Sequence, residues 1–390
     1  QAAKPRTAAV SMEVRAMRGT PFGAGLLAAA ILSWLLGASA CGRAPGPPPV
    51  GRPAPASDLV YYSTGDPGVV NAVDWTGQPR TPFALPPTPR GMPHYPGETL
   101  PRRLWIDSVS PDGSKILLGD GSIRDRAGRV LATLAATDGL RPTWADSSRH
   151  LCQLTTPGFA LFTGGSLTGP AQLTWVTPGS RPRVVATVGQ FGFTSSVDVL
   201  ACSEQSGVAV IADRTASGVT QAAKTGLDPV TTLLVVRIAD GSILYQRSYP
   251  VSAAPISGYV VAVSPDGRYA AETNLTLAAR PAAPGGPTVI RELPSGAVVM
   301  TLEPLWVQGF SGDDGRIVVS AGPGLAATEV LEWRTGAVVW TAGASSVLAV
   351  RQPGGSALMV RDVANLDLWL VAADGSARQV AWSVGGVYGL

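Results

Sequence analysis

Histidine and charged residues are scarce in this chain, and each shortage argues against a kind of function. The 390 residues include only two histidines, His94 and His150, and neither lies at metal-ligand spacing from a cysteine or a carboxylate. We therefore expect no metal site and no cofactor. Charged residues make up 15% of the chain, and no basic stripe interleaved with aromatic residues occurs, which argues against nucleic-acid binding.

Glycine and proline, in contrast, are abundant, with 46 and 34 copies. Together with 45% hydrophobic residues, this composition is typical of many short strands joined by tight turns, so we expect an all-β fold. The formal net charge of +3 comes from the first 57 residues, which hold six bases and one acid. The remaining residues hold 24 bases and 26 acids, so their net charge is −2.

The N-terminal region has the pattern of an export signal. Residues 22–36 form an almost uninterrupted apolar stretch, preceded by Arg15 and Arg18 and followed by four small residues. The stretch is shorter than the about 20 apolar residues that a membrane-spanning helix needs, so a retained anchor is the weaker interpretation. The residues before Met12 or Met17 are interpreted as an extension ahead of the true start.

Cys41 directly follows the small residues, and this arrangement resembles the lipobox of bacterial lipoproteins. The resemblance implies acylation of Cys41 and stable membrane anchoring, since two or more acyl chains hold a protein on a bilayer. The chain departs from the family pattern at Ala38, where lipoproteins usually have Leu. The small residues could instead form an ordinary signal-peptidase site, which would release the protein.

Three segments follow from these patterns. Residues 1–41 are predicted to be the signal with its N-terminal extension, and residues 42–57, rich in Pro, Gly and Ala, an extended tether. Residues 58–390 repeat one pattern, in which four strands alternate with a Ser-Pro-Asp-Gly turn, a loop and a glycine turn. The clearest Ser-Pro-Asp-Gly turns lie at 110–113 and 264–267, with degenerate or weaker copies at 146–148, 195–198, 311–315 and 352–355.

The residues of these turns have defined conformational roles. Pro presets one backbone angle, Asp bonds to the local backbone, and Gly accepts a positive φ. The glycine turn, which joins the third strand to the fourth, recurs seven times, at Gly77, Gly128, Gly179, Gly241, Gly296, Gly336 and Gly375. The spacing of 39 to 62 residues fits propeller blades with loop insertions.

The first repeat lacks its first strand, because residues 59–64, 69–75 and 81–85 match the second, third and fourth strands. The last residues, 386–390, resemble the first strands of the other repeats. We therefore predict a seven-bladed β-propeller of four-stranded blades, closed by the C-terminal strand pairing into blade 1, which removes exposed sheet edges. The alternative is another all-β stack, such as two sandwiches.

The Ser-Pro-Asp-Gly turns resemble those of TolB-type, WD-like propeller repeats, which occur in many bacterial envelope proteins. The resemblance covers residues 58–390. It implies the propeller fold but little about function, because propellers include binding modules and unrelated enzymes. Aromatic residues mark the predicted first strands, and we interpret most of them as blade-packing residues: Trp105, Trp144, Phe193, Tyr259, Trp306 and Tyr388.

The two remaining cysteines, Cys152 and Cys202, are predicted to lie in the second strands of consecutive blades. A disulfide between them is possible outside the cytoplasm, and two buried free thiols are the alternative. No catalytic constellation is found. Residues 164–169 lack the strand-turn-helix context of a nucleophile elbow, and Asp313 and Asp314 are interpreted as turn formers.

The predicted long loops leave from one face of the ring. Insertions on one face of a repeat protein usually mark its binding side, although drift in tolerant loops is the alternative. The candidate binding residues there are His94, Tyr95, Arg102, Arg103, Phe159 and Phe162. We expect a monomeric, exported binding module, tethered to a bacterial membrane, for an envelope protein, a peptide or a glycan. The alternative is a propeller enzyme, such as a lactonase, a quinoprotein or a glycan-active enzyme, with a site at the channel mouth.

Overall fold

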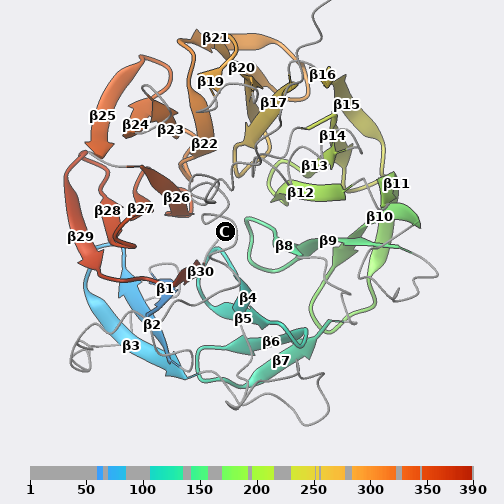
Figure 1. The fold of residues 1–390 in the computed structure, drawn as a ribbon. Coiled ribbons are helices and arrows are strands. Elements are labelled where there is room, and N and C mark those ends of the chain that lie inside the picture. Colours follow the sequence, from blue (N-terminus) through green and yellow to red (C-terminus); the bar gives the residue numbers. More distant parts are fainter. Residues whose placement is uncertain are drawn as a thin grey trace, which may run out of the picture.

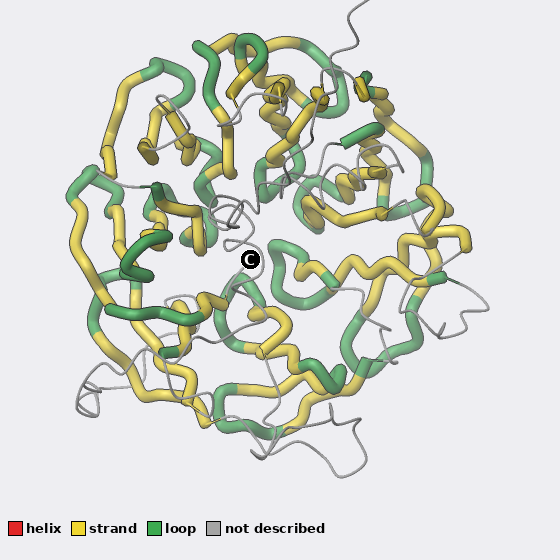
Figure 2. The backbone as a smooth tube through the Cα atoms, viewed as in Figure 1, coloured by secondary structure: helices red, strands yellow, loops and turns green. Residues whose placement is uncertain are grey.

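The computed structural model describes residues 59–64, 69–84, 106–134, 142–156, 169–191, 196–214, 230–250, 252–253, 256–276, 283–321, 327–342 and 345–388. These ranges contain strands, turns and loops (Figure 2). No helix long and apolar enough to cross a membrane occurs in the described part of the chain. The predicted signal, Cys41 and the tether lie outside it.

Seven antiparallel sheets stand side by side around a central axis, and each forms one blade of a propeller (Figure 1). From the innermost strand outward, blade 1 contains β30 (Gly386–Tyr388), β1 (Leu59–Ser63), β2 (Val69–Asp74) and β3 (Pro79–Ala84). Blade 2 contains β4 (Ile106–Val109), β5 (Lys115–Leu118), β6 (Ser122–Asp125) and β7 (Val130–Thr133). Blade 3 contains β8 (Thr143–Trp144), β9 (Leu151–Thr155), β10 (Gly169–Val176) and β11 (Arg183–Phe191).

The other four blades continue the ring. Blade 4 contains β12 (Ser196–Ser203), β13 (Val208–Arg214), β14 (Thr232–Arg237) and β15 (Ile243–Ser248). Blade 5 contains β17 (Ile256–Val263), β18 (Tyr269–Thr276), β20 (Thr288–Glu292) and β21 (Val298–Leu302), with two short additions, β16 (Ser252–Ala253) and β19 (Ala283–Pro284). Blade 6 contains β22 (Trp306–Phe310), β23 (Arg316–Ala321), β24 (Ala327–Glu332) and β25 (Ala337–Ala342). Blade 7 contains β26 (Ser346–Arg351), β27 (Leu358–Asp362), β28 (Leu368–Val371) and β29 (Ala377–Ala381).

The predicted closure of the ring is confirmed. Strand β30 pairs antiparallel with β1, so that Tyr388 lies opposite Tyr61 and Val387 opposite Tyr62. The two ends of the described chain therefore share blade 1, and the C-terminal strand lies near the centre of the ring (Figure 1).

The seven predicted glycine turns are also confirmed. Each of these glycines has a positive φ, between 68° and 83°, and joins the third strand of its blade to the fourth. Two of them have a second reason to be glycine. A Cβ at Gly241 would overlap the carbonyl of Val185 in the preceding blade, and one at Gly296 would overlap the ring of Tyr245.

The hydrophobic core is divided among the seven seams between blades, and one cluster fills each seam. Strand β13 shows how one sequence supplies two seams. Ala209 and Ile211 pack toward blade 3, whereas Val208 and Val210 pack toward blade 5. Because side chains alternate across a strand, a continuous apolar run is what a blade buried on both faces requires.

One part of the blade assignment is wrong. Cys202 lies in β12, the first strand of blade 4, and not in a second strand. Residues 196–198 belong to this strand and not to a turn, and the first turn of blade 4 follows Ser203. The sequence misled because this turn contains neither Pro nor Asp. The extra strands β16 and β19 were also not predicted. Of the aromatic markers, Trp105 and Phe193 lie outside the described residues.

Candidate functional site

The propeller has two unlike faces. The short-turn face is the side formed by the turns from first to second strand and from third to fourth strand. The long-loop face is the opposite side, where second strands lead to third strands and each blade leads to the next. The long connections between described strands, 85–105, 157–168 and 215–229, all belong to the long-loop side of this topology. All six candidate binding residues fall in the first two, outside the described residues.

Hydrogen bonds link the turns of neighbouring blades on the short-turn face. The links are Tyr61 hydroxyl to Gly113 O (3.2 Å), Asp112 N to Ser148 Oγ (2.9 Å), Lys115 Nζ to Ser148 O (2.7 Å), Glu204 N to Asp146 Oδ1 (2.8 Å), Ser206 Oγ to Asp266 O (2.6 Å) and Asp313 N to Gly355 O (3.1 Å). They involve all seven blades. Because these backbone and side-chain groups bond to the neighbouring blade, we interpret the short-turn face as the side that holds the blades together.

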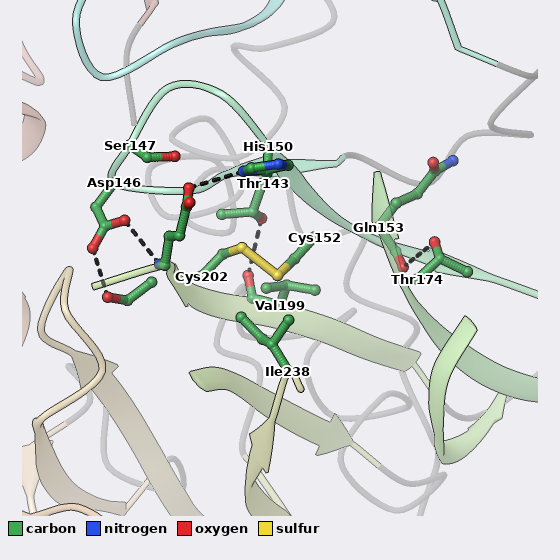
Figure 3. The surroundings of a disulfide bond; sticks show 12 residues. Thr143, Asp146, Ser147, His150, Cys152, Gln153, Thr174, Val199, Cys202 and Ile238 are labelled. Carbon is green, nitrogen blue, oxygen red and sulfur yellow. Dashed lines mark hydrogen bonds and ion pairs between the residues drawn. A yellow bond between two sulfur atoms is a disulfide. The ribbon is translucent and has the colours of Figure 1, made fainter. Parts of the chain in front are cut away.

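A disulfide joins Cys152 in β9 to Cys202 in β12, across the seam between blades 3 and 4 (Figure 3). The two Cα atoms are 5.9 Å apart, and both residues are buried. Blade 3 has an inner strand of only two residues, so β12 of the next blade contacts β9 directly. The bond therefore joins two strands of neighbouring blades that already lie against each other.

A polar cluster lies beside this disulfide (Figure 3). Asp146 accepts hydrogen bonds from Ser203 Oγ at 2.6 Å and from Glu204 N at 2.8 Å, and His150 Nδ1 lies 2.8 Å from Glu204 Oε2. A hydrogen bond from Ser147, with His150 nearby, lowers the pKa of Glu204. These contacts connect the first turn of blade 3 to the first turn of blade 4.

Asp314 is the most unusual residue of the short-turn face. It occupies the place that Gly113 and Gly267 hold in other blades and keeps their left-handed backbone, with φ 57°. Its side chain is buried, and its Oδ1 has no hydrogen-bond partner among the described residues. Burial, with the Asp266 carboxylate of the preceding blade, raises the pKa of Asp314 to about 8, against the influence of Arg351 and Arg268. Backbone strain and a perturbed carboxyl together mark a candidate site.

The two adjacent carboxylates that the sequence analysis interpreted as turn formers have different roles in the structure. Asp313 is a turn former, because its Oδ1 accepts bonds from Ser311 Oγ at 2.6 Å and from Gly315 N at 3.0 Å. Asp314 instead faces Asp266, which is 48 residues away in sequence. Only the ring geometry brings the two turns together, so no local pattern could have paired them.

Glu272 shows what a fully partnered buried carboxylate is like in this molecule. It lies 3.0 Å from Arg247 Nε and 2.9 Å from Arg291 Nε, and Tyr249 donates a hydrogen bond of 2.8 Å. These contacts join blades 4 and 5 and leave the charge compensated. For Asp314, burial and the Asp266 carboxylate outweigh the influence of Arg351 and Arg268, so its pKa is raised.

Neither arrangement forms a metal site. No group of three or more His, Cys, Asp or Glu side chains that could hold a metal comes together in the described ranges. A small hollow opens where blade 1 lacks a covalent first turn, and it holds about 10 Å³, the room for a single water molecule. Its lining includes Leu59, Trp75, Ser110, Pro111, Arg351 and Tyr388. An organic substrate needs a cavity of about 300 Å³ or more, so this hollow is not an active site.

Comparison with known proteins shows the fold and no closer relationship. No family model matches the chain, and no curated protein matches its sequence. Among solved structures, a prolyl endopeptidase is similar with a TM-score of 0.50 and 11% identity, over 83% of this chain and 50% of that one. The chain thus spans about half the length of that peptidase. The Myceliophteria thermophila Cps50 (Swd1) β-propeller domain has a TM-score of 0.44 and 11% identity, over 86% of this chain and 98% of that one.

The Kuenenia stuttgartiensis hydrazine synthase also has a TM-score of 0.44, with 12% identity over 87% of this chain and 98% of that one. At such identities, similarity extends to the fold alone. The chain has a WD-like β-propeller fold, and proteins with this fold carry out unrelated functions.

Proposed function

We propose that the protein is an exported, membrane-tethered β-propeller that binds an envelope protein, a peptide or a glycan on its long-loop face. The observation that supports this most is the contrast between the faces. The turns of the short-turn face are short and interlocked, whereas the connections of 12 residues or more lie on the other side. In repeat proteins such insertions usually form the binding surface.

The place where the chain enters the ring supports the same orientation. Leu59, the first residue of β1, lies beside the short-turn residues Ser110 and Pro353. A tether that arrives from Cys41 therefore reaches the short-turn face. An anchored propeller would point its long-loop face away from the membrane, toward a partner.

Substitution of the six candidate loop residues by Ala tests the binding function. We expect these changes, at His94, Tyr95, Arg102, Arg103, Phe159 and Phe162, to remove a reproducible partner recovered from envelope extracts, because aromatic and Arg side chains carry most binding energy. Gln78→Ala, Thr177→Ala and Gln205→Ala on the short-turn face are the control. Lys115 and Arg316 are unsuitable controls, because each bonds to a neighbouring blade. An unchanged partner list in the first set would reject this binding surface.

Substitution of Cys41 tests the tether. In the full chain, Cys41→Ser should move the protein from the membrane to the soluble exported fraction. If the membrane fraction is unchanged, the lipid anchor is wrong.

Asp314 gives the enzyme alternative one specific observation in its favour. A carboxyl that titrates near pH 8 beside Asp266 could exchange a proton with a substrate at the channel mouth. If the purified protein converts a lactone, alcohol or glycan and Asp314→Asn abolishes the turnover, the enzyme function replaces the binding function.

A further inference from the structure

We propose that the short-turn face is a second interaction surface, which contacts the anionic head groups of a lipid bilayer. The proposal rests on the proposed function only for the tether that brings this face to the membrane. Residues 42–58 could span at most about 60 Å when extended, and they join the ring at Leu59, on this face. The face next to the tether is therefore the one that a membrane can reach.

Among the described residues, exposed charge is distributed unequally between the two faces. All exposed bases of these residues lie in the short turns or within two residues of them: Arg129, Arg149, Arg181, Arg183, Arg237, Arg268, Arg334 and Arg378. The exposed acids in the same turns are fewer: Asp240, Asp313, Glu332 and Asp374. In the rest of the described chain the exposed charges are acidic, at Asp198 and Glu303. Eight exposed bases therefore accompany four exposed acids in the described short turns. Four of the bases also pair with a carboxylate of this face: Arg129 with Asp125, Arg149 with Glu204, Arg237 with Asp240 and Arg268 with Asp266. The most exposed charge on the described part of the short-turn face is thus positive.

Exposed aliphatic side chains lie along the same rim. Seven of the nine exposed large hydrophobic residues of the described chain follow a glycine turn by two to five positions, at the start of an outer strand. They are Val130, Leu131, Val184, Ile243, Val298, Val299 and Val338, in blades 2 to 6. The exposed fraction of these residues reaches 54% at Val184 and Val338. An Arg next to such an aliphatic residue recurs, as in Arg129 and Val130 or Arg183 and Val184.

This combination fits a lipid surface better than a protein or a nucleic acid. Aliphatic groups enter the head-group region while arginines contact lipid phosphates. Protein hot spots and single-stranded nucleic-acid platforms depend on aromatic residues. The described aromatic residues of the short-turn face are buried or half-buried, and the exposed Trp382 belongs to the connection from β29 to β30 on the other side.

The test uses residues 42–390, which retain every described strand, so that the acyl chains cannot contribute. Binding to phosphatidylcholine vesicles with and without phosphatidylglycerol is measured by co-sedimentation. We expect binding only to the anionic vesicles and its loss at high salt. The triple variant Arg129→Gln, Arg181→Gln and Arg268→Gln, at bases for which no bond to a neighbouring blade is seen among the described residues, should weaken partition about a hundredfold, since each base near an anionic surface contributes about fivefold.

The aliphatic component has its own variant. Ile243→Thr, Val298→Thr and Val338→Thr keep the β-branched shape but lose apolar surface, so we expect weaker binding at unchanged melting temperature. Val347→Thr, at an exposed residue of the inner strand β26, is the matched control and should bind normally.

The proposal is overturned if residues 42–390 do not bind anionic vesicles. Equal binding to DNA or to an acidic protein, insensitive to the three Thr substitutions, would also overturn it by showing a general polyanion surface. Release of the full chain by Cys41→Ser is a separate result. It decides the anchor whether or not the face binds lipid.

Discussion

Blades 1 and 3 have the two shortest inner strands of the ring, and the protein supports them in different ways. Strand β8 of blade 3 has two residues, and β30 of blade 1 has three. Blade 3 is linked to blade 4 by the disulfide between Cys152 and Cys202. Blade 1 has no covalent link at its closure and depends on backbone pairing between β30 and β1.

The closure compensates with burial. Val384, just before β30, is completely buried in the cluster between blades 7 and 1, and Tyr388 packs into the cluster between blades 1 and 2. Gly385 N also donates a hydrogen bond of 2.9 Å to Ser63 O. A short inner strand is thus tolerated where either a covalent bond or two neighbouring cores hold it.

Removal of residues 384–390 should have the largest effect. The truncation deletes the inner strand of blade 1, opens two seams and exposes the edge of β1, so we expect a loss of more than about 4 kcal/mol and a tendency to aggregate. Thermal unfolding and light scattering measure both effects. A truncated protein that stays monomeric with an unchanged melting temperature would contradict the shared blade.

Removal of the disulfide should have the next largest effect. The bond closes a loop of 50 residues, which the chain-entropy model values at about 4 kcal/mol. Cys152→Ala with Cys202→Ala should lower the free energy of unfolding by an amount of this order. Mass spectrometry of unreduced, alkylated protein is the direct check, and two alkylated thiols would show that the bond is absent.

The seam between blades 5 and 6 extends the comparison, because the buried carboxyl of Asp314 destabilises this seam. The pKa of Asp314 is about 8 in the folded protein and about 3.8 as a free side chain. Below the lower value both states hold the proton, and between the two values only the folded state does. Stability should therefore fall as pH rises through this window and level off above pH 8.

Asp314→Asn removes this pH dependence. Its melting temperature should exceed that of the parent by a margin that grows from pH 4 to pH 8 and then stays constant. Asp313→Asn, at the exposed neighbouring turn residue, is the matched control for the loss of one carboxylate from this turn. A constant difference across the range would mean that Asp314 is ionised throughout.

The sequence alone predicted the repeated four-stranded unit but did not predict the contacts between units. Gly77 and its six equivalents were found because a positive φ selects glycine locally, and residues 386–390 were assigned to blade 1 because the first repeat lacked a strand. Cys202 was placed in the wrong strand because the first turn of blade 4 lacks the Ser-Pro-Asp-Gly pattern. The approach of Asp314 to Asp266 depends on the angle between blades, which no local residue pattern encodes.

Ser148 provides the smallest effect and the finest test of the seams. It holds φ at 59°, where blades 2 and 5 have Gly113 and Gly267, and its Oγ accepts a hydrogen bond of 2.9 Å from Asp112 N across the seam between blades 2 and 3. Ser148→Ala keeps the strained backbone and loses the bond, so it should cost about 1 kcal/mol. Ser148→Gly loses the bond but relieves the strain, so the net change should be within about 0.5 kcal/mol. Equal destabilisation by both substitutions in urea unfolding would show that the inter-blade bond alone, and not the backbone, decides which residue this turn accepts.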